Sequence, residues 1–433
     1  MPLPDLIEIV PLKKPVRAEI TVPGSKSITN RALVLAALAD GETVLGGALW
    51  SEDTQVMVDG LVKLGFAVKV EPDPDEVCNR AITVHGLGGK IPNAGTLEKP
   101  LELFVGNAGT AARFLATLVC LGHGIYRLDG VKRMRERPQE ALFDALRELG
   151  YCIDSANSKL PALVHGSGPK PGAICCVSIT ESSQFASALM MCARVGEWQV
   201  KVVGENKEES PYVVLTSSLI EEFRRQGQIA PRFVQIEPDA SSGSYFWGAA
   251  WLHQEHSISV RHWPDSNWQM DQKFPDVAPT SPFPKLPEVM SRENLLGDSI
   301  MTAIVLAPFV SRHCKFTHLG RLRLQECERV VALRTELAKC GAKVIEEGDT
   351  LTVYPSELHG AEIETYNDHR MAMCFAILGL KVPGIKIKNP ACVKKTFPNF
   401  FQKLTDQPPH GLGATILDAK TGRALTRDEL FTE

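Results

Sequence analysis

The feature that most constrains the fold of this chain is a unit that recurs six times along its 433 residues. In each copy, a cluster of small, polar or charged residues opens an apolar helix, and a short break leads into an apolar strand. Recurrence on this scale indicates one supersecondary unit used many times. The clusters start at Ser27, Gly109, Ser182, Ser241, Asp298 and Asp368. We therefore predict an α/β fold built from repeats.

The helices that follow these clusters are apolar on nearly every face, as residues 32–39 and 185–193 show. Helices of this kind are buried inside a fold. Amphipathic helices with one wet face alternate with them, and they are expected at 54–64, 139–149, 213–224 and 328–339. The pattern predicts two domains of three units, with buried parallel helices and sheets outside. A generic α/β array is the alternative, which the recurring clusters disfavour.

Composition narrows the class of protein and its partners. Hydrophobic residues make up 44% of the chain and charged residues 23%, as in ordinary globular proteins. The net charge of −4 disfavours a nucleic-acid binder, and no apolar run is long enough to span a membrane. The 11 cysteines are scattered without a C-x-x-C pair, which indicates reduced thiols in a cytoplasm-like compartment and disfavours a zinc site.

The first cluster carries the chemistry of an anion site. Residues 17–22 are predicted to form a strand, residues 23–24 a tight turn, and Ser27 the N-cap of the following helix. Lys26 and Arg31 add an ammonium and a guanidinium at the positive end of that helix. A strand, a turn and a helix with solvated charges are the ordinary explanation of the same residues.

Further cations and carboxylates stand at the entrances of other helices. They lie in the Gly-rich loop 106–113, the arginine cluster 133–138, the segments 323–329 and 368–370, and at Lys395. Arginine suits bidentate recognition of carboxylate and phosphate, and a carboxylate beside a cation suits proton transfer. Helix capping or surface ion pairing explains any one of these stretches alone. Together they predict an anion-binding cleft between the domains.

Two regions are shorter or less regular than the repeat predicts. Only residues 230–239 separate the outer helix of the third unit from the fourth cluster. The many prolines in 263–290 predict an irregular loop, either mobile or in contact with a partner. The tail, 408–433, is predicted to hold a hairpin formed by 414–417 and 424–425.

Seven short motifs occur in order along the chain. They are P-G-S-K-S-x-x-x-R at 23–31, N-A-G-T-A-x-R at 107–113, R-M-x-x-R-P at 133–138, S-S-Q at 182–184, D-A-S-S at 239–242, E-x-x-R at 326–329 and N-D-H-R-M-A-M at 367–373. As a set they resemble the motifs of the 5-enolpyruvylshikimate-3-phosphate synthase family of enolpyruvyl transferases. The resemblance implies a two-domain inside-out α/β barrel of six βαβαββ-type units, some of them trimmed.

The resemblance also implies where the domains lie and what the chain does. Residues 26–239 would form one domain and 1–25 with 240–433 the other, with the active site in the cleft between them. The family transfers the enolpyruvyl group of phosphoenolpyruvate to a hydroxyl of shikimate 3-phosphate and releases phosphate through a tetrahedral intermediate. No metal or organic cofactor is implied, and we expect a cytoplasmic monomer.

Motif matches assign a role to each candidate residue. Proton transfer would fall to Lys26, Asp298 and Glu326, with His369 assisting. Phosphoenolpyruvate would be bound by Lys26, Asn107, Gly109, Arg133, Arg329, Arg370 and Lys395. The acceptor would be held by Ser27, Arg31, Ser182, Ser183, Gln184, Tyr212, Asp298 and Gln325.

The chain departs from the family pattern at two positions on the acceptor side. Glu209 stands where the family usually has a serine, and Gln325 where it usually has a lysine. Both usual residues help to hold the 3-phosphate, which a glutamate would repel. Another acceptor, such as a nucleoside, a nucleotide or a sugar, is therefore the alternative. UDP-N-acetylglucosamine is disfavoured because residues 130–137 lack the cysteine usual in that sister family. Retention of Lys26, Asp298 and the other proton-transfer residues disfavours a non-catalytic binding protein.

Overall fold

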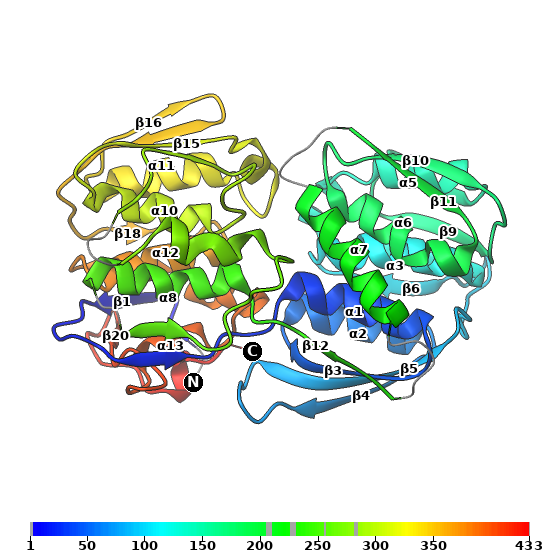
Figure 1. Cartoon of the computed structure of the whole chain (residues 1–433), viewed down its shortest axis with the longest axis horizontal. Coiled ribbons are helices and arrows are strands. Elements are labelled where there is room, and N and C mark those ends of the chain that lie inside the picture. Colours follow the sequence, from blue (N-terminus) through cyan, green and yellow to red (C-terminus); the bar gives the residue numbers. More distant parts are fainter. Residues whose placement is uncertain (1–2, 205–209, 226–230, 255–256, 281–284, 433) are drawn as a thin grey trace. The chain divides into compact units, whose positions relative to one another are not determined.

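The computed structural model describes residues 3–204, 210–225, 231–254, 257–280 and 285–432 (Figure 1). The chain divides into two compact units. Unit 1 comprises Met1–Pro23 and Pro238–Glu433, and unit 2 comprises Gly24–Glu237. These boundaries lie two residues before the expected domain boundaries.

Unit 2 contains three sheets, one for each of its repeats. The strand order of the first is β12-β3-β5-β4 and that of the second is β6-β7-β9-β8, while β10 and β11 form a two-stranded sheet. The strands are β3 (Asp40–Leu49), β4 (Ala67–Pro72), β5 (Asn79–Leu87), β6 (Leu101–Phe104), β7 (His123–Asp129), β8 (Cys152–Asp154), β9 (Ala162–Ser167), β10 (Ile174–Ser178), β11 (Gln199–Val203) and β12 (Arg232–Gln235). The sheet of the third repeat is thus the trimmed one.

The helices of unit 2 form a buried set and an outer set. The buried helices are α1 (Lys26–Leu38), α3 (Gly109–Leu118), which continues as a 3₁₀ turn (Val119–Leu121), and α6 (Ser183–Gly196). They contact one another, and every residue of α3 is buried. The outer helices are α2 (Glu52–Lys63), α5 (Glu140–Glu148) and α7 (Ser210–Arg225), and α4 (Lys132–Glu136) is a single short turn. The expected alternation of apolar and amphipathic helices is confirmed.

Unit 1 repeats this plan. Its sheets have the orders β14-β15-β17-β16 and β18-β19-β1-β20, and among the described residues the fourth repeat keeps only the pair β13-β2. The strands are β1 (Leu6–Val10), β2 (Ala18–Ile20), β13 (Ile258–Val260), β14 (Val289–Ser291), β15 (Cys314–Thr317), β16 (Val344–Glu347), β17 (Thr350–Val353), β18 (Glu362–Ile363), β19 (Ile385–Lys388) and β20 (Thr415–Asp418).

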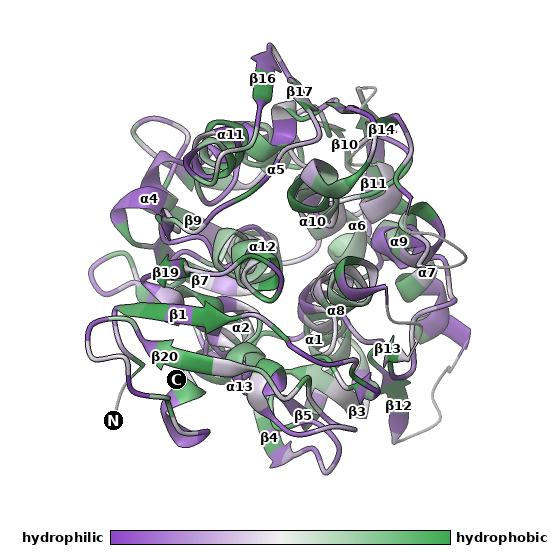
Figure 2. Cartoon of the chain, turned by 90° about the vertical axis from the view of Figure 1, so that its left-hand side faces the viewer, coloured by the Kyte–Doolittle hydropathy of each residue, from purple (hydrophilic) through white to green (hydrophobic). Residues whose placement is uncertain are grey.

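The core of unit 1 is built by α8 (Ala240–His253), α10 (Ile300–Leu306) and α12 (His369–Gly379), which contact one another. Figure 2 shows these helices nearly end-on, with β1, β14 and β16 farther out. The remaining helical elements are α9 (Phe274–Val277), α11 (Arg329–Lys339), α13 (Phe400–Thr405) and the 3₁₀ turns η2 (Met270–Lys273), η3 (Ala307–Phe309), η4 (Gly320–Leu324), η5 (Pro390–Lys395) and η6 (Asp428–Leu430). Apolar helices inside and sheets outside are what the sequence predicts.

All four of the larger sheets share one pairing pattern. Each begins with a parallel pair, such as β6 with β7, and continues with two antiparallel pairs, such as β7 with β9 and β9 with β8. The same succession occurs in the sheets that contain β3, β15 and β19. Identical topology in different stretches of sequence confirms that one supersecondary unit is used repeatedly.

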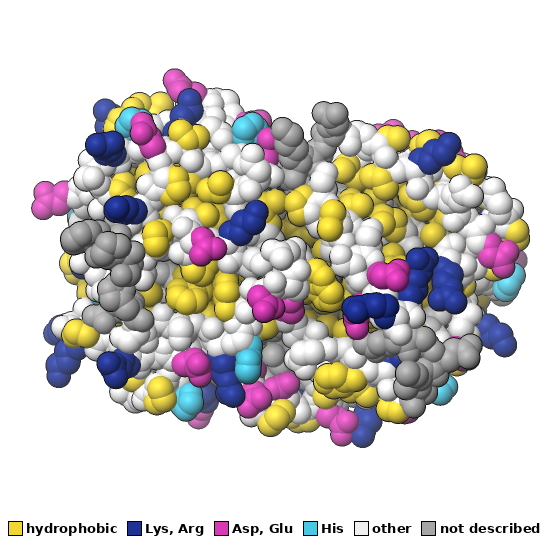
Figure 3. Space-filling model, in the orientation of Figure 1, with side chains coloured by type: hydrophobic (Ala, Val, Ile, Leu, Met, Phe, Trp, Pro, Cys, Tyr) yellow, Lys and Arg dark blue, Asp and Glu magenta, His cyan; other side chains and the backbone are white. Residues whose placement is uncertain are grey.

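The surface of the chain is mixed in charge. Lysine, arginine and acidic side chains are interspersed over the face in Figure 3, as a net charge of −4 suggests. Within the described residues, no helix is long and apolar enough to cross a membrane. All 11 cysteines are free thiols, as expected from their spacing.

The predicted N-cap of the first helix is wrong. Helix α1 begins at Lys26, so its N-cap is Ser25, which is extended at φ −61° and ψ 118° and makes no side-chain capping bond. The amide of Thr29 donates to the carbonyl of Ser25 at 2.8 Å, which closes the first turn two residues earlier than the sequence indicates. Ser27 therefore lies inside the first turn.

Residues 281–284 of the proline-rich segment lie outside the described residues. The described part, 263–280 and 285–290, is more ordered than the predicted irregular loop. It contains η2 and α9, and Phe274 at the start of α9 is fully buried. The side chain of Asp271, which is 5% exposed, accepts hydrogen bonds from the amides of Gly297 and Ser299 at 2.6 Å and 3.2 Å. The segment thereby satisfies backbone donors that precede α10.

The tail forms the expected hairpin. Leu417 bridges Ala424 in antiparallel fashion, and the amide of Leu425 donates to the carbonyl of Ile416. The first strand of the hairpin, β20, pairs with β1 and completes a four-stranded sheet. The tail is therefore part of the architecture of the sixth repeat.

We predict that Asp271→Ala destabilises unit 1. The change leaves buried amide donors without a partner, which costs about 1 to 3 kcal/mol of unfolding free energy. Urea unfolding followed by tryptophan fluorescence measures this loss of unfolding free energy. Four tryptophans belong to unit 1: Trp247, Trp251, Trp263 and Trp268. Asp276→Ala, at an exposed position of the same segment, is the matched control. Equal stability of the two variants would contradict the anchoring role of Asp271.

Candidate active site

Unit 1 brings together candidate residues from four parts of the chain. Asp298 precedes α10, and Gln325 and Glu326 follow η4. Arg329 is the first residue of α11, and Arg370 lies in the first turn of α12. Lys395 is the last residue of η5. Helix entrances thus supply most of the cluster, as the repeated motif predicts.

Arg329 is the hub of this cluster. Its side chain is 1% exposed, and Nε donates to Oδ2 of Asp368 at 2.7 Å. Its Nη2 donates to Oε2 of Glu326 at 2.8 Å, and its Nη1 donates to Oε1 of Gln325. Burial by itself would lower the pKa of Arg329, but the surrounding carboxylates raise it above the ordinary value. The guanidinium is therefore held charged in a buried site.

Asp298 faces three guanidiniums. Its Oδ1 lies 2.9 Å from Nη2 of Arg292, and its Oδ2 lies 3.1 Å from Nε of Arg370 and 3.5 Å from Nη1 of Arg329. Burial alone would raise the pKa of Asp298, but the three guanidiniums lower it well below the usual range. Asp298 is consequently an ionised carboxylate with little tendency to take a proton in this state.

Glu326 joins two of the predicted phosphoenolpyruvate ligands. Its Oε1 accepts a hydrogen bond from Nζ of Lys395 at 2.9 Å, and its Oε2 accepts the one from Arg329. The side chains of Glu326 and Lys395 are 13% and 11% exposed. A carboxylate predicted for proton transfer therefore touches cations predicted to bind the substrate.

His369 and Asp368 stand together at the start of α12. Asp368 is fully buried and caps the helix by accepting a hydrogen bond from the amide of Arg370 at 2.9 Å. Nδ1 of His369 lies 3.6 Å from Oδ1 of Asp368, and His369 is 2% exposed. Asp368 thus fixes Arg329 relative to the helix entrance, and His369 lies beside the same carboxylate.

In unit 2, Lys26 is paired with an acidic residue that the sequence motifs do not point to. Nζ of Lys26 donates to Oδ2 of Asp53, near the start of α2, at 2.9 Å. The Lys26 side chain is 21% exposed, whereas that of Asp53 is 6% exposed. The ammonium therefore keeps access to solvent on one side while Asp53 orients it.

Arg31 is buried and bonds to three helices. Its Nε donates to Oγ1 of Thr216 at 2.8 Å, and its Nη2 donates to Oγ of Ser187 at 3.0 Å. Its Nη1 donates to the carbonyl of Ser27 at 2.9 Å. The guanidinium therefore ties α1 to α6 and α7, a structural role that motif matching does not show.

The loop before α3 lies against two guanidiniums. Nη1 of Arg137 donates to the carbonyl of Asn107 at 3.3 Å, and Nη1 of Arg113 donates to Oε1 of Gln184 at 3.4 Å. A Cβ placed on Gly109 would come within 2.3 Å of Arg113 and 2.7 Å of Arg137. A side chain at this position would therefore displace the ends of both guanidiniums, which approach the backbone at the helix entrance.

Other candidates of unit 2 are more dispersed. Arg133 pairs with Glu136 at 3.0 Å on the surface, and its side chain is 44% exposed. Oγ of Ser182 accepts a hydrogen bond from the amide of Gln184 and caps α6, next to the buried Ser183. Tyr212 lies in the first turn of α7, where its carbonyl accepts a hydrogen bond from Thr216. Glu209 lies outside the described residues.

Several charged residues of these clusters were not assigned a role from the sequence. They are Asp53, Arg113, Arg137, Arg292 and Asp368. Asp368 and Arg137 lie inside quoted motifs, and their position beside assigned residues was the available signal. Arg292 gave no sequence signal, because an isolated arginine next to a short strand has the pattern of a surface residue. It is 2% exposed, and its partner Asp298 lies six residues away across a turn.

The family model of EPSP synthase (3-phosphoshikimate 1-carboxyvinyltransferase) matches residues 10–278 and 288–404. A 3-phosphoshikimate 1-carboxyvinyltransferase from Opitutus terrae is 37% identical over 93% of this chain and 98% of its own length. The chloroplastic 3-phosphoshikimate 1-carboxyvinyltransferase 1 of Nicotiana tabacum is 34% identical over 94% of this chain and 86% of its own length.

Solved structures show the same fold. EPSP synthase from Acinetobacter baumannii has a TM-score of 0.72 at 19% identity and covers 95% of this chain and 99% of its own. The enolpyruvyl transferase NikO from Streptomyces tendae has a TM-score of 0.67 at 14% identity and covers 98% of this chain and 100% of its own. The predicted enolpyruvyl-transferase-like α/β fold is confirmed.

We predict that Asp298→Asn lowers the free energy of unfolding, and that this loss becomes smaller only at acidic pH. Breaking a buried charge cluster costs about 3 to 5 kcal/mol. Because the pKa of Asp298 is lowered on folding, its carboxylate stabilises the fold above the unfolded pKa of about 3.9, and this contribution declines below it. Urea unfolding should give the same wild-type-to-variant difference at pH 7 and pH 5, and a smaller one at pH 3.5. Asp276→Asn is the control, and a difference that already shrinks between pH 7 and pH 5 would contradict this assignment.

Proposed function

This chain belongs to the EPSP synthase (3-phosphoshikimate 1-carboxyvinyltransferase) family, and on that premise we propose that it transfers the enolpyruvyl group of phosphoenolpyruvate to a hydroxyl of shikimate 3-phosphate, with release of phosphate. The observation that carries the proposal is the buried cluster around Arg329. There, predicted substrate cations and predicted proton-transfer carboxylates are in direct contact.

Phosphoenolpyruvate would bind to cations that the free protein holds on its own carboxylates. Arg329, Arg370 and Lys395 each contact Asp298 or Glu326. Guanidinium groups can bind carboxylate and phosphate in bidentate fashion. An incoming anion would take over part of these contacts. Because the cations are already in place, binding costs little reorganisation, and they stabilise charge that develops in the transition state.

The reaction needs two proton transfers in its addition step. The acceptor hydroxyl loses a proton as its oxygen attacks C2 of phosphoenolpyruvate, and C3 gains a proton to form the methyl group. Asp298 would take the hydroxyl proton, and Glu326 or Lys26 would handle the methyl proton. When phosphate then leaves C2, the methyl group returns a proton and the vinyl group is restored.

The guanidiniums around Asp298 suggest how its basicity is controlled. In the free protein they lower its pKa, so it is a weak base. A bound phosphoenolpyruvate would draw Arg329 and Arg370 toward its own negative charges and weaken their hold on Asp298. The pKa of Asp298 would rise as a result. The carboxylate would thus become a stronger base when the substrate is bound.

Unit 2 would contribute the ammonium of Lys26 and the N-terminal ends of its buried helices. Lys26 stands at the start of α1, partly exposed and oriented by Asp53. Such helix entrances favour negative charge. We propose that residues of both units act on the same substrate, and that His369, which lies beside Asp368, assists by hydrogen bonding.

A different acceptor is the second candidate, and one observation favours it. Gln325 bonds to Arg329 and, through Nε2 at 3.4 Å, to Oδ1 of Asp298. It therefore occupies a place beside the proposed base without supplying the positive charge that a lysine would offer to a phosphate. A nucleoside, a nucleotide or a sugar would be the acceptor under this alternative.

Phosphate release tests the proposal. The purified protein is given phosphoenolpyruvate and shikimate 3-phosphate, and mass spectrometry identifies the enolpyruvyl product. We expect turnover with this acceptor. If the protein binds phosphoenolpyruvate but does not turn over, a different acceptor is indicated, and nucleotides and sugars would be screened. A protein that does neither would refute the proposal.

We predict that Lys26→Met lowers kcat by at least about 100-fold, because it removes a positive charge next to the reacting group. Lys90→Met removes an exposed lysine of the same unit and serves as the matched control. The phosphate-release assay measures both variants. Near-normal turnover of Lys26→Met would show that Lys26 is misassigned.

We also predict that Arg292→Met moves the acid limb of the kcat pH profile to higher pH by about one unit. The change removes one of the guanidiniums that lower the pKa of Asp298. Arg312→Met, at an exposed position of unit 1, is the control and should leave the profile unchanged. An acid limb that does not move in Arg292→Met would contradict Asp298 as the base.

A further inference from the structure

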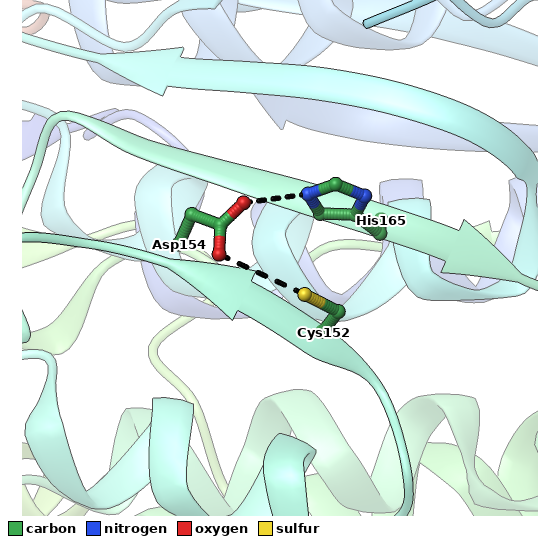
Figure 4. Close-up of side chains that lie close together, drawn as sticks. All are labelled: Cys152, Asp154 and His165. Carbon is green, nitrogen blue, oxygen red and sulfur yellow. Dashed lines mark hydrogen bonds and ion pairs between the residues drawn. The ribbon is translucent and has the colours of Figure 1, made fainter.

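Three potential metal ligands meet on an outer face of unit 2, away from the residues used above (Figure 4). Cys152 and Asp154 lie on β8, and His165 lies on the neighbouring strand β9. One ligand atom from each side chain lies within 4.8 Å of the others. Nε2 of His165 is 2.8 Å from Oδ2 of Asp154, and Sγ of Cys152 is 3.7 Å from Oδ1 of the same carboxylate. The three side chains therefore converge on one point.

Strand geometry explains why they converge. Cys152 and His165 are directly opposite each other in the antiparallel pairing of β8 and β9. Asp154 follows Cys152 by two residues and so shares its face of the sheet. The neighbouring residues point to the opposite face, as strand alternation requires: Ile153 on β8 and Val164 on β9 are both buried. The backbone thus fixes all three side chains on the outer face.

We propose that Cys152, Asp154 and His165 bind a zinc ion, with water as the fourth ligand. A thiolate, an imidazole and a carboxylate are the ligand types that zinc takes in proteins, and three protein ligands with water is a known arrangement. Bond lengths of about 2.0 to 2.3 Å in tetrahedral geometry place neighbouring ligand atoms about 3.5 Å apart. In the structure the His165–Asp154 and Cys152–Asp154 distances, 2.8 Å and 3.7 Å, lie on either side of this value, and all three ligand atoms lie within 4.8 Å of one another.

Small side-chain rotations would complete the site. Cys152 and Asp154 are exposed and His165 is partly exposed, so their side chains have room to turn. The carboxylate now accepts a hydrogen bond from both neighbours, and on metal binding each of these contacts would be replaced by a bond to zinc. The site is open to solvent, which allows the ion to enter.

Two neighbouring cations, Arg147 and Arg127, have partners of their own. Arg147 pairs with Asp144 at 2.8 Å and donates to the carbonyl of Ile153. Arg127 pairs with Glu102 at 3.2 Å and Asp129 at 3.3 Å. Neither guanidinium forms an ion pair with Asp154 among the described residues, so the carboxylate remains available to a metal ion.

The place of the site in the sheet indicates its effect. β8 is an edge strand in the order β6-β7-β9-β8. A metal ion bound by β8 and β9 would join the edge strand to its neighbour and stabilise the folded state, because an unfolded chain does not hold the three ligands together. The ordinary alternative is a surface ion pair between His165 and Asp154, with Cys152 beside it by chance.

Cobalt(II) tests the site directly, because a thiolate bound to cobalt gives a charge-transfer absorption. We expect the metal-free protein to bind one cobalt ion per chain with this absorption, and zinc to displace it. Cys152→Ser and His165→Asn should each weaken binding by about 100-fold or more, since loss of even an outer partner of a ligand costs about 10- to 100-fold. Cys176→Ser and His85→Asn change exposed residues of the same unit and should leave binding intact.

A second readout is the thermal midpoint. Zinc should raise it for the wild type and the two control variants, and leave it unchanged for Cys152→Ser and His165→Asn. Without metal, all variants should unfold at the wild-type temperature. Absorption that persists in Cys152→Ser, or zinc stabilisation that persists in His165→Asn, would overturn the proposal. So would a wild type that binds cobalt no more tightly than Cys152→Ser.

Discussion

The rest of the candidate site depends on the buried pairing of Arg329 with Asp368. Arg329 begins α11 and Asp368 caps α12, so one ion pair at 2.7 Å fixes the entrances of two helices. Neither side chain has meaningful contact with solvent, and removing one partner of such a pair leaves an uncompensated buried charge. The same guanidinium also holds Glu326, and the same carboxylate lies beside His369. The pair therefore connects two of the proposed catalytic groups of unit 1, Glu326 and His369.

A cluster of this kind is a costly way to stabilise a fold, and its value lies in what it can bind. Buried ion pairs often contribute little net stability, because taking the charges out of water costs several kcal/mol. Here, the cations already surround carboxylates at the place where an anionic substrate is proposed to bind. In the proposed mechanism, the protein's own carboxylates keep the cations in position, phosphoenolpyruvate would replace part of their contacts, and that exchange would couple binding to the basicity of Asp298.

The amount that could be predicted from the sequence differs from element to element. The six apolar helices and their following strands were predictable because each repeat has a strong hydrophobic pattern bounded by polar residues. The N-cap of α1 was misplaced by two residues, since Ser25 and Ser27 are chemically equal and only the φ and ψ angles decide between them. Residues 263–290 were predicted to be irregular because of their prolines. The anchoring by Asp271 could not be predicted, because the amide of Gly297 that donates to it lies outside this segment.

The sequence by itself determined the repeats, the class of fold and the polar motifs at the helix entrances, because each of these depends on neighbours within a few residues. Only the tertiary structure decided which charges meet. It placed Arg292 on Asp298, although Arg292 lies in no predicted motif. It buried Arg31 between helices and left Arg133 on the surface, although both lie in predicted motifs. It also brought Cys152 opposite His165 across two strands. Contacts between segments far apart in the chain depend on strand register and helix packing, which no local pattern of residues encodes.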